Sequence, residues 1–191
     1  MRLRSTIALH EAGHAVIGVL LGNEVDFVRV DDGEGACGGS GLRSNAESVI
    51  ATFAGPWAQR LFSDEPPTNA ECSEDFRAID QTLRIVSPFS CPQIMRREEL
   101  KWESRRMVIA NERSIRELAD MLVKWGYIGW PATMSATEII KSILEPTSQA
   151  AGKATYEQAL REAPRKAPRK AMHDADAKIS GGKSSQSPHK D

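Results

Sequence analysis

Three features are scarce in this sequence of 191 residues: cysteine, an excess of either charge, and long apolar runs. The three cysteines, Cys37, Cys72 and Cys91, are odd in number and form no C-x-x-C pair, which disfavours a disulfide scaffold and predicts a reduced, cytoplasmic chain. With 25 Lys and Arg against 26 Asp and Glu, the net charge of −1 gives no strong signal for nucleic-acid binding.

Long apolar runs are the third absence. A membrane span needs about 18 consecutive apolar residues, and the longest candidate, residues 15–21, is interrupted by Gly18. The first apolar stretch of the chain also contains His10, Glu11 and His14, which a secretory signal would not carry. We therefore expect neither a signal peptide nor a membrane anchor.

The composition changes near Pro146. Residues 1–145 carry 16 basic and 21 acidic side chains, whereas residues 146–191 carry 9 basic and 5 acidic ones. We predict a folded domain over 1–145 and a basic, disordered tail over 146–191, with a helical stretch near residues 156–162. For the tail we expect a solvated terminus, and the alternative is a segment that docks on an acidic partner, nucleic acid or a membrane surface.

The folded part is predicted to be mostly helical, an α+β domain with one small β hairpin or ribbon. Apolar residues at steps of three and four predict helices over residues 5–21, 44–61, 73–86, 93–124 and 135–144. Ser44 and Ser135 each precede a Glu by three residues, which is the capping-box pattern, and Ser73 is the expected cap of the third helix. Pro56 should kink or restart the second. Strands are expected over residues 25–30 and 40–42.

One motif carries chemistry: His10-Glu11-Ala12-Gly13-His14, an H-E-x-x-H sequence inside the first predicted helix. Residues four apart share a helix face, so both imidazoles can bind one metal ion, and zinc suits this donor set. Zinc lowers the pKa of a bound water to about 7. Glu11 would take the proton of that water as it attacks a peptide carbonyl and pass it to the leaving amine.

A catalytic zinc needs a third protein ligand. The metzincin pattern is excluded because Ile17 and Leu20 stand where that class has Gly and His, and His173 and His189 lie in the predicted tail. A carboxylate must then serve, and the helix beginning near Ser73 offers three candidates that spacing alone does not separate: Glu74, Asp75 and Asp80.

These residues resemble the peptidase domain of FtsH-type proteases, which are membrane-anchored, ATP-dependent zinc metalloproteases. The resemblance spans about residues 5–144 and is most specific in the H-E-A-G-H helix. Residues 53–59 are similar to the A/G-G-x-x-A-E helix of that domain, and residues 72–76 to its S-x-D segment. In the family the Asp of this segment is the third zinc ligand, so the resemblance implies a metal site of His10, His14 and Asp75 with Glu11 as the catalytic base.

Two departures from the family matter. Gln59 replaces its usual Glu and Pro56 enters the helix, which leaves the role of this position open. No AAA+ module is recognisable, because Gly181-Gly182-Lys183-Ser184 lacks the first glycine of a phosphate-binding loop, Ala177 standing in its place. By resemblance, the expected partners are other copies of the chain in a hexamer and an ATPase acting in trans.

The sequence thus predicts a Zn²⁺-dependent metalloendopeptidase that cleaves unfolded or extended polypeptides without ATP. The alternative is a non-catalytic adaptor or regulator of an ATPase or protease partner that keeps the fold; retention of Glu11 favours the enzyme. The strand over residues 25–30 either binds substrate at an exposed edge or packs in the core. For residues 33–41 we expect a turn rather than a mobile flap. For residues 125–130 we expect a packed connection between helices rather than a binding platform, and the alternative is an oligomeric interface.

Overall fold

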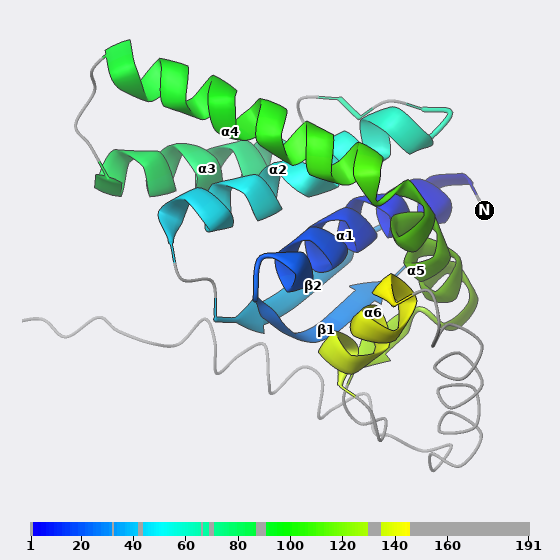
Figure 1. Cartoon of the computed structure of the whole chain (residues 1–191). Helices are drawn as coiled ribbons and strands as arrows, with labels where there is room; N and C mark the ends of the chain where they lie inside the picture. Colours follow the sequence, from blue (N-terminus) through cyan, green and yellow to red (C-terminus); the bar gives the residue numbers. More distant parts are fainter. Residues whose placement is uncertain are drawn as a thin grey trace, which may run out of the picture.

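A computed structural model describes residues 2–31, 33–41, 44–65, 67–68, 71–86, 91–129 and 135–145. The described chain is mainly helical with a small antiparallel sheet, which confirms the predicted fold class (Figure 1). Its elements in chain order are α1 (Arg2–Leu20), β1 (Glu24–Val30), β2 (Gly35–Ser40), α2 (Asn45–Phe62), α3 (Ser73–Val86), α4 (Cys91–Ala110), α5 (Glu112–Trp125), β3 (Tyr127–Gly129) and α6 (Ala136–Leu144).

The predicted tail, with residues 156–162, His173 and His189, lies outside the described residues, as does Leu42 of the second predicted strand. None of the described helices is both long and apolar enough to cross a membrane.

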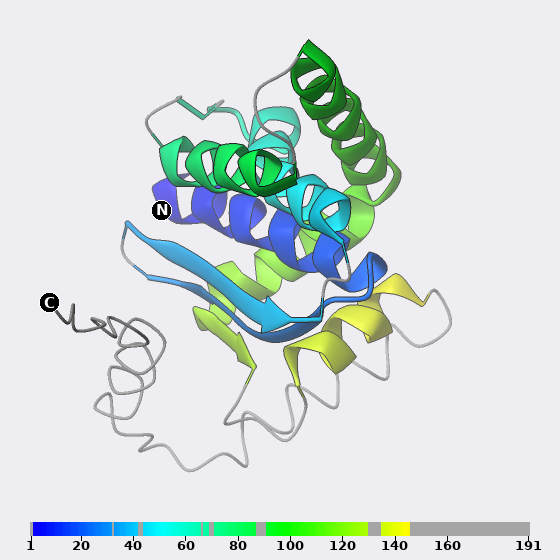
Figure 2. The same cartoon turned by 90° about the vertical axis from the view of Figure 1, so that its left-hand side faces the viewer.

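Helix α1 is the centre of the fold, with the sheet on one side and α2 on the other (Figures 1 and 2). Its apolar residues are buried on both sides, and Gly13 lets α2 approach closely. A Cβ atom on Gly13 would lie 2.6 Å from the Ala54 carbonyl oxygen and 2.7 Å from the Ala58 Cβ. Any larger residue at position 13 would therefore push α1 and α2 apart.

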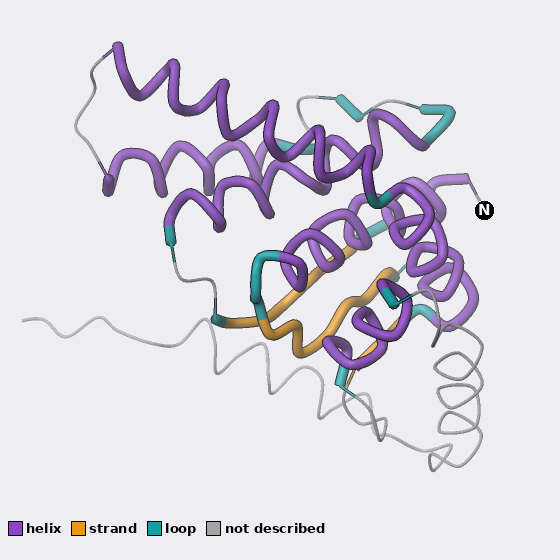
Figure 3. The backbone as a smooth tube through the Cα atoms, in the orientation of Figure 1, coloured by secondary structure: helices purple, strands orange, loops and turns teal. Residues whose placement is uncertain are grey.

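The sheet has the strand order β2-β1-β3, and both pairings are antiparallel (Figure 3). A register shift between Val25 and Phe27 changes the alternation of β1, so that Val25, Val28 and Val30 are all buried. β1 is thus an interior strand that packs in the core. The predicted exposed edge at residues 25–30 is therefore wrong, because β2 and β3 occupy both of its edges.

Two further expectations about the strands need correction. The second strand occupies Gly35–Ser40 rather than residues 40–42, so most of the predicted glycine turn is strand. The turn itself is shorter and involves a hydrogen bond from the Asp31 N–H to the Glu34 carbonyl. The connection at residues 125–130 contains the strand β3. A strand of three residues is too short to be recognised from the alternation of apolar and polar residues.

The helix boundaries follow the capping signals where these are complete. Ser44 and Ser135 form the two predicted capping boxes. Ser73 is the first residue of α3 rather than its cap, because the Cys72 carbonyl already accepts the Phe76 N–H.

The other boundaries depend on tertiary packing. Helix α2 runs through Pro56 without the predicted restart, since α1, α3 and α4 all pack against it. The predicted helix over 93–124 is divided at Asn111, whose carbonyl opens α5 and whose side-chain amide donates to Met107 at the end of α4.

Candidate metal centre

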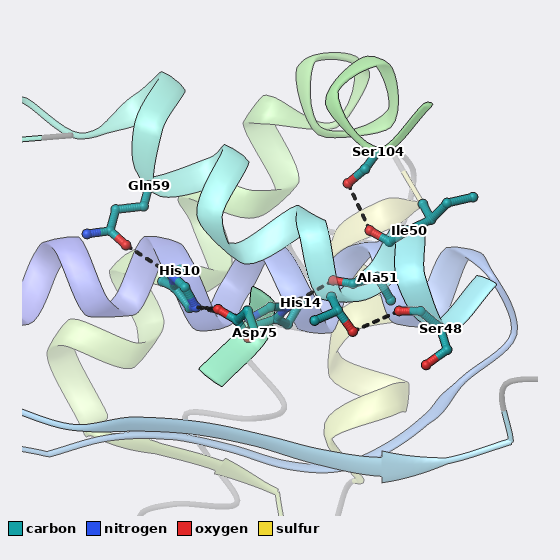
Figure 4. Close-up of polar contacts among 9 residues, drawn as sticks. His10, His14, Ser48, Ile50, Ala51, Gln59, Asp75 and Ser104 are labelled. Atoms are coloured by element: carbon teal, nitrogen blue, oxygen red, sulfur yellow. Dashed lines mark hydrogen bonds and ion pairs between the residues drawn. The ribbon is translucent and has the colours of Figure 1, made fainter. Parts of the chain in front are cut away.

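Two helices bring the predicted ligands together. His10 and His14 lie one turn apart on α1, and Asp75 comes from the first turn of α3 and lies between the two rings (Figure 4). His10 Nε2 is 3.0 Å from Asp75 Oδ2, His14 Nε2 is 3.3 Å from Asp75 Oδ1, and the two Nε2 atoms are 3.0 Å apart. The structure thus places all three predicted ligands at one point.

The spacing of these atoms fits a tetrahedral zinc ion. Zinc binds nitrogen and oxygen at about 2.0–2.2 Å, which puts neighbouring ligand atoms of a tetrahedron about 3.3 Å apart. One atom from each of His10, His14 and Asp75 lies within 4.8 Å of the others, and no further group of three such residues is found among the described ones. Three protein ligands leave the fourth position to water or substrate, as in catalytic zinc sites.

Neither of the other two candidate carboxylates of α3 joins the cluster formed by His10, His14 and Asp75. The Asp80 carboxylate accepts from Arg97 of α4 at 3.2 Å, and the Glu74 side chain is 90% exposed. Asp75, by contrast, is 20% exposed and faces the two histidines. Geometry therefore separates three carboxylates that the spacing of the sequence left equivalent.

Helix α2 sets the orientation of both imidazoles. The Ala51 carbonyl accepts a hydrogen bond from His14 Nδ1 at 2.9 Å, and Gln59 Oε1 accepts one from His10 Nδ1 at 3.0 Å (Figure 4). A carbonyl oxygen can only accept, so each Nδ1 carries the proton and each Nε2 is left to bind a metal. Gln59, which is 5% exposed, supports His10 in this way without being charged.

Two glycines make room for the site, and no sequence pattern indicates their role. A Cβ on Gly55 of α2 would lie 2.3 Å from His14 Nε2, and one on Gly35 of β2 would lie 2.5 Å from Glu11 Oε1. Neither glycine has a positive φ angle, so the close approach of the neighbouring side chain explains why each is a glycine. The backbone of α2 therefore packs closely against His14, and the backbone of β2 packs closely against Glu11.

Charge in the site is unevenly shared. Burial lowers the pKa of each histidine, but the hydrogen bonds and charge of Asp75 outweigh it and raise the pKa of both His10 and His14 to about 9. Burial opposes ionisation of Asp75, yet the two imidazoles hold its pKa well below its usual range. Without a metal, a proton thus takes the place of the cation between these side chains.

Glu11 has the opposite environment. It is 8% exposed, and burial raises its pKa above the ordinary value of 4.5, although the neighbouring histidines partly offset this. Its carboxylate touches the start of β2, where Cys37 also lies. A carboxyl whose pKa is moved towards neutrality is suited to exchanging protons during a reaction.

The three candidate ligands, Glu11 and Gln59 all line one cavity of about 500 Å³. Its floor is α1 with the candidate ligands and Glu11, and its walls are the first half of β2 and the start of α3. Thr68 and Glu71 shape the approach to α3, because Glu71 Oε2 accepts from the Thr68 N–H and the Glu71 N–H donates to Thr68 Oγ1. A buried carboxyl beside three convergent metal donors in an open cavity makes this the candidate metal site of the described residues.

Comparison with known proteins is consistent with a metal site. Residues 3–63 match the model of a family described as Peptidase M50B-like, which supports a zinc metallopeptidase-type domain. The matched segment contains His10, Glu11, His14 and Gln59 but ends before Asp75. This family is distinct from the FtsH family that the motifs resemble. No curated protein matches the chain.

Proposed function

We propose that this chain is a zinc-dependent metalloendopeptidase that hydrolyses peptide bonds in unfolded or extended polypeptides. The observation that carries the proposal is the meeting of His10, His14 and Asp75 in a cavity whose floor also holds the buried Glu11. The peptidase-like match over residues 3–63 supports the same class independently of this geometry.

Each residue has a defined task in the proposed reaction. His10, His14 and Asp75 would hold Zn²⁺, which supplies a Lewis acid that lowers the pKa of water to about 7. Glu11 takes a proton from the attacking water at a carboxylate oxygen and delivers it to the amide nitrogen as the C–N bond breaks. Ala51 and Gln59 keep the imidazoles in the metal-binding tautomer.

The substrate would bind along β2. Within the described residues β2 pairs only with β1, and Gly35, Ala36 and Cys37 line the cavity with small side chains. A segment added to this edge as another strand would run past Glu11, and only an extended chain can form such a ladder. This preference for extended segments is why we propose unfolded polypeptides as substrates and cleavage that needs no ATP.

The FtsH-like part of the proposal concerns Asp75. The similarity of residues 72–76 to the FtsH segment and the position of Asp75 between the imidazoles both support an FtsH-type ligand set. A hexamer and an ATPase acting in trans stay predictions of the resemblance.

The test separates an enzyme from an adaptor. We expect purified chain loaded with zinc to cleave unfolded casein, and Glu11→Gln to bind zinc and casein equally well but to cleave at least about 100-fold more slowly, because it cannot take the proton. If wild type and Glu11→Gln bind casein alike and neither cleaves it, the chain is an adaptor and the proposal is wrong.

A further inference from the structure

Helix α4 carries apolar side chains on two opposite faces, one of them buried and the other exposed. Its inner face is buried: Leu100 and Val108 pack in the core, and Ser104 Oγ donates to the Ile50 carbonyl of α2 at 2.8 Å (Figure 4). Its outer face carries four exposed apolar residues, which are Ile94 at 70%, Met95 at 63%, Trp102 at 51% and Ile109 at 45% exposure. α4 also lies at the edge of the molecule farthest from the sheet (Figures 1 and 2).

The exposed residues form a line along α4. Met95, Trp102 and Ile109 are spaced by seven residues, and positions seven apart on an α-helix drift by only about 20°. We call these three residues the outer stripe. A straight apolar line at this spacing is the surface that a second helix covers in a two-helix pair, whereas scattered exposed apolar residues would need no partner.

Trp102, at the middle of the outer stripe, is held in one place. The Trp57 ring lies 6.1 Å from it, centroid to centroid, and the Arg105 guanidinium lies 5.6 Å from the Trp102 centroid and 5.7 Å from that of Trp57. The Trp57 indole is in turn anchored by a hydrogen bond from its Nε1 to the Lys101 carbonyl at 3.0 Å. A large aromatic residue that is ordered before binding loses little entropy and suits the centre of an interface.

The charged residues on either side of the outer stripe indicate which partner would fit it. The two glutamates Glu98 and Glu99 lie on the N-terminal side of Trp102, and the two arginines Arg105 and Arg106 lie on its C-terminal side. If a second α4 runs antiparallel about a two-fold axis at Trp102, Met95 faces Ile109 of the second copy. On the two flanks, Glu98 then faces Arg105 of the second copy and Glu99 faces Arg106 of the second copy.

We propose that this face docks a second copy of the same chain, as an antiparallel α4 pair centred on Trp102. A parallel pair would set like charges opposite each other, which disfavours it. The basic tail of the chain, with 9 basic and 5 acidic residues, is also disfavoured as the occupant, because α4 itself carries five basic and three acidic side chains. The proposal does not depend on the proposed peptidase activity.

Sedimentation of the full chain over a range of concentrations tests the pair. We expect wild type to reach twice its 21.0 kDa mass, with micromolar affinity on the order expected of a small interface. Trp102→Glu should stay a monomer. A wild type that is monomeric up to about 100 μM, a hundredfold above that affinity, or a dimer that Trp102→Glu leaves intact, would overturn the proposal.

Charge exchange makes the test specific for the antiparallel arrangement. Glu99→Arg sets two arginines opposite each other at both of the 99–106 contacts of its own dimer, and Arg106→Glu sets two glutamates at the same contacts. We expect each variant alone to lose at least about tenfold in dimer affinity and an equal mixture of the two to recover it. Lys141→Glu on α6, which has the same charge change as Arg106→Glu, is the control and should dimerise like wild type. Failure of the mixture to associate would reject the antiparallel pair.

Discussion

At the scale of single residues, the site depends on glycines, which have no side chain, as much as on the metal ligands. Gly13, Gly35 and Gly55 each stand where a Cβ would meet α1 or a neighbour at 2.7 Å or less. These contacts join elements far apart in the chain, so nothing in the local sequence distinguishes such a glycine from one in a turn. The ligand pair at positions 10 and 14 was predictable because helix periodicity alone sets it.

Gly55→Ala tests this reading. The added methyl would lie 2.3 Å from His14 Nε2, so His14 must turn away from the metal position. We expect zinc affinity to fall by about 10- to 100-fold, the range seen when support for a zinc ligand is lost, with the helical circular dichroism unchanged. Gly18→Ala on α1 is the matched control, because its nearest neighbour is the flexible Asn23 amide at 3.3 Å. Equal zinc affinities of the two variants would contradict the account.

Asp75 and Asp80 allow a second comparison on one helix. Asp75 faces both imidazoles, whereas Asp80 accepts from Arg97 at the surface. Asp75→Ala should therefore lose bound zinc after gel filtration, and Asp80→Ala should keep about one zinc per chain. Zinc content measured by elemental analysis decides the matter, and retention by both variants would remove Asp75 from the ligand set.

Gln59 shows how a departure from a family pattern can preserve a role. The residue resembles a position that is Glu in FtsH-type domains, and the sequence left its function open. In the structure its side-chain oxygen accepts a hydrogen bond from His10 Nδ1 at 3.0 Å. A glutamate carboxylate could accept the same hydrogen bond, but it would add a negative charge. The sequence could not establish this because the contact joins residues 49 positions apart in the chain.

At the scale of elements, the site exists only where α1, α2, α3 and β2 pack together. Helix positions could be predicted from periodicity and capping boxes, and most boundaries agree within a few residues. The strands were harder, because β2 consists of Gly, Ala, Cys and Ser and lacks the β-branched residues that mark a strand. For β1 the sequence left core packing and an exposed edge as open alternatives, because the short β3 that covers its second edge comes about a hundred residues later.

The contacts of Asp75 on α3 with the two histidines of α1 make the stability of the metal-free protein depend on pH. Folding raises the pKa of His10 and His14 from 6.5 to about 9, so their contribution is fully present below pH 6.5 and is lost as the pH rises to about 9. Folding lowers the pKa of Asp75, so its contribution is present above its ordinary value of 3.8 and is lost as the pH falls below it.

Urea unfolding with a chelator present checks this dependence. We expect the unfolding midpoint to fall between about pH 6 and pH 9.5, as the imidazoles lose the protons that pair them with Asp75. The double variant His10→Gln/His14→Gln should show a much weaker fall over the same interval. A wild-type midpoint that stays constant or rises would show that the imidazoles are not stabilised in their protonated form.

At the scale of the whole molecule, two faces do separate work. The cavity between α1, β2 and α3 holds the proposed chemistry. Helix α4, which carries the outer stripe, packs against α2 and supplies none of the residues that line this cavity. The sequence predicted the chemistry because an H-E-x-x-H helix encodes it locally. It did not predict the exposed face of α4, because the sequence pattern of a helix with two apolar faces is the same whether one face or both faces are buried.

The central claim is tested most directly by titrating zinc into chelator-treated chain while its cleavage of unfolded casein is measured. We predict that activity returns in proportion to added zinc and is complete at one equivalent per chain. Glu11→Gln should take up the same single equivalent and remain at least about 100-fold slower. Cleavage that persists in the chelator, or that Glu11→Gln retains in full, would contradict a zinc peptidase with Glu11 as its base.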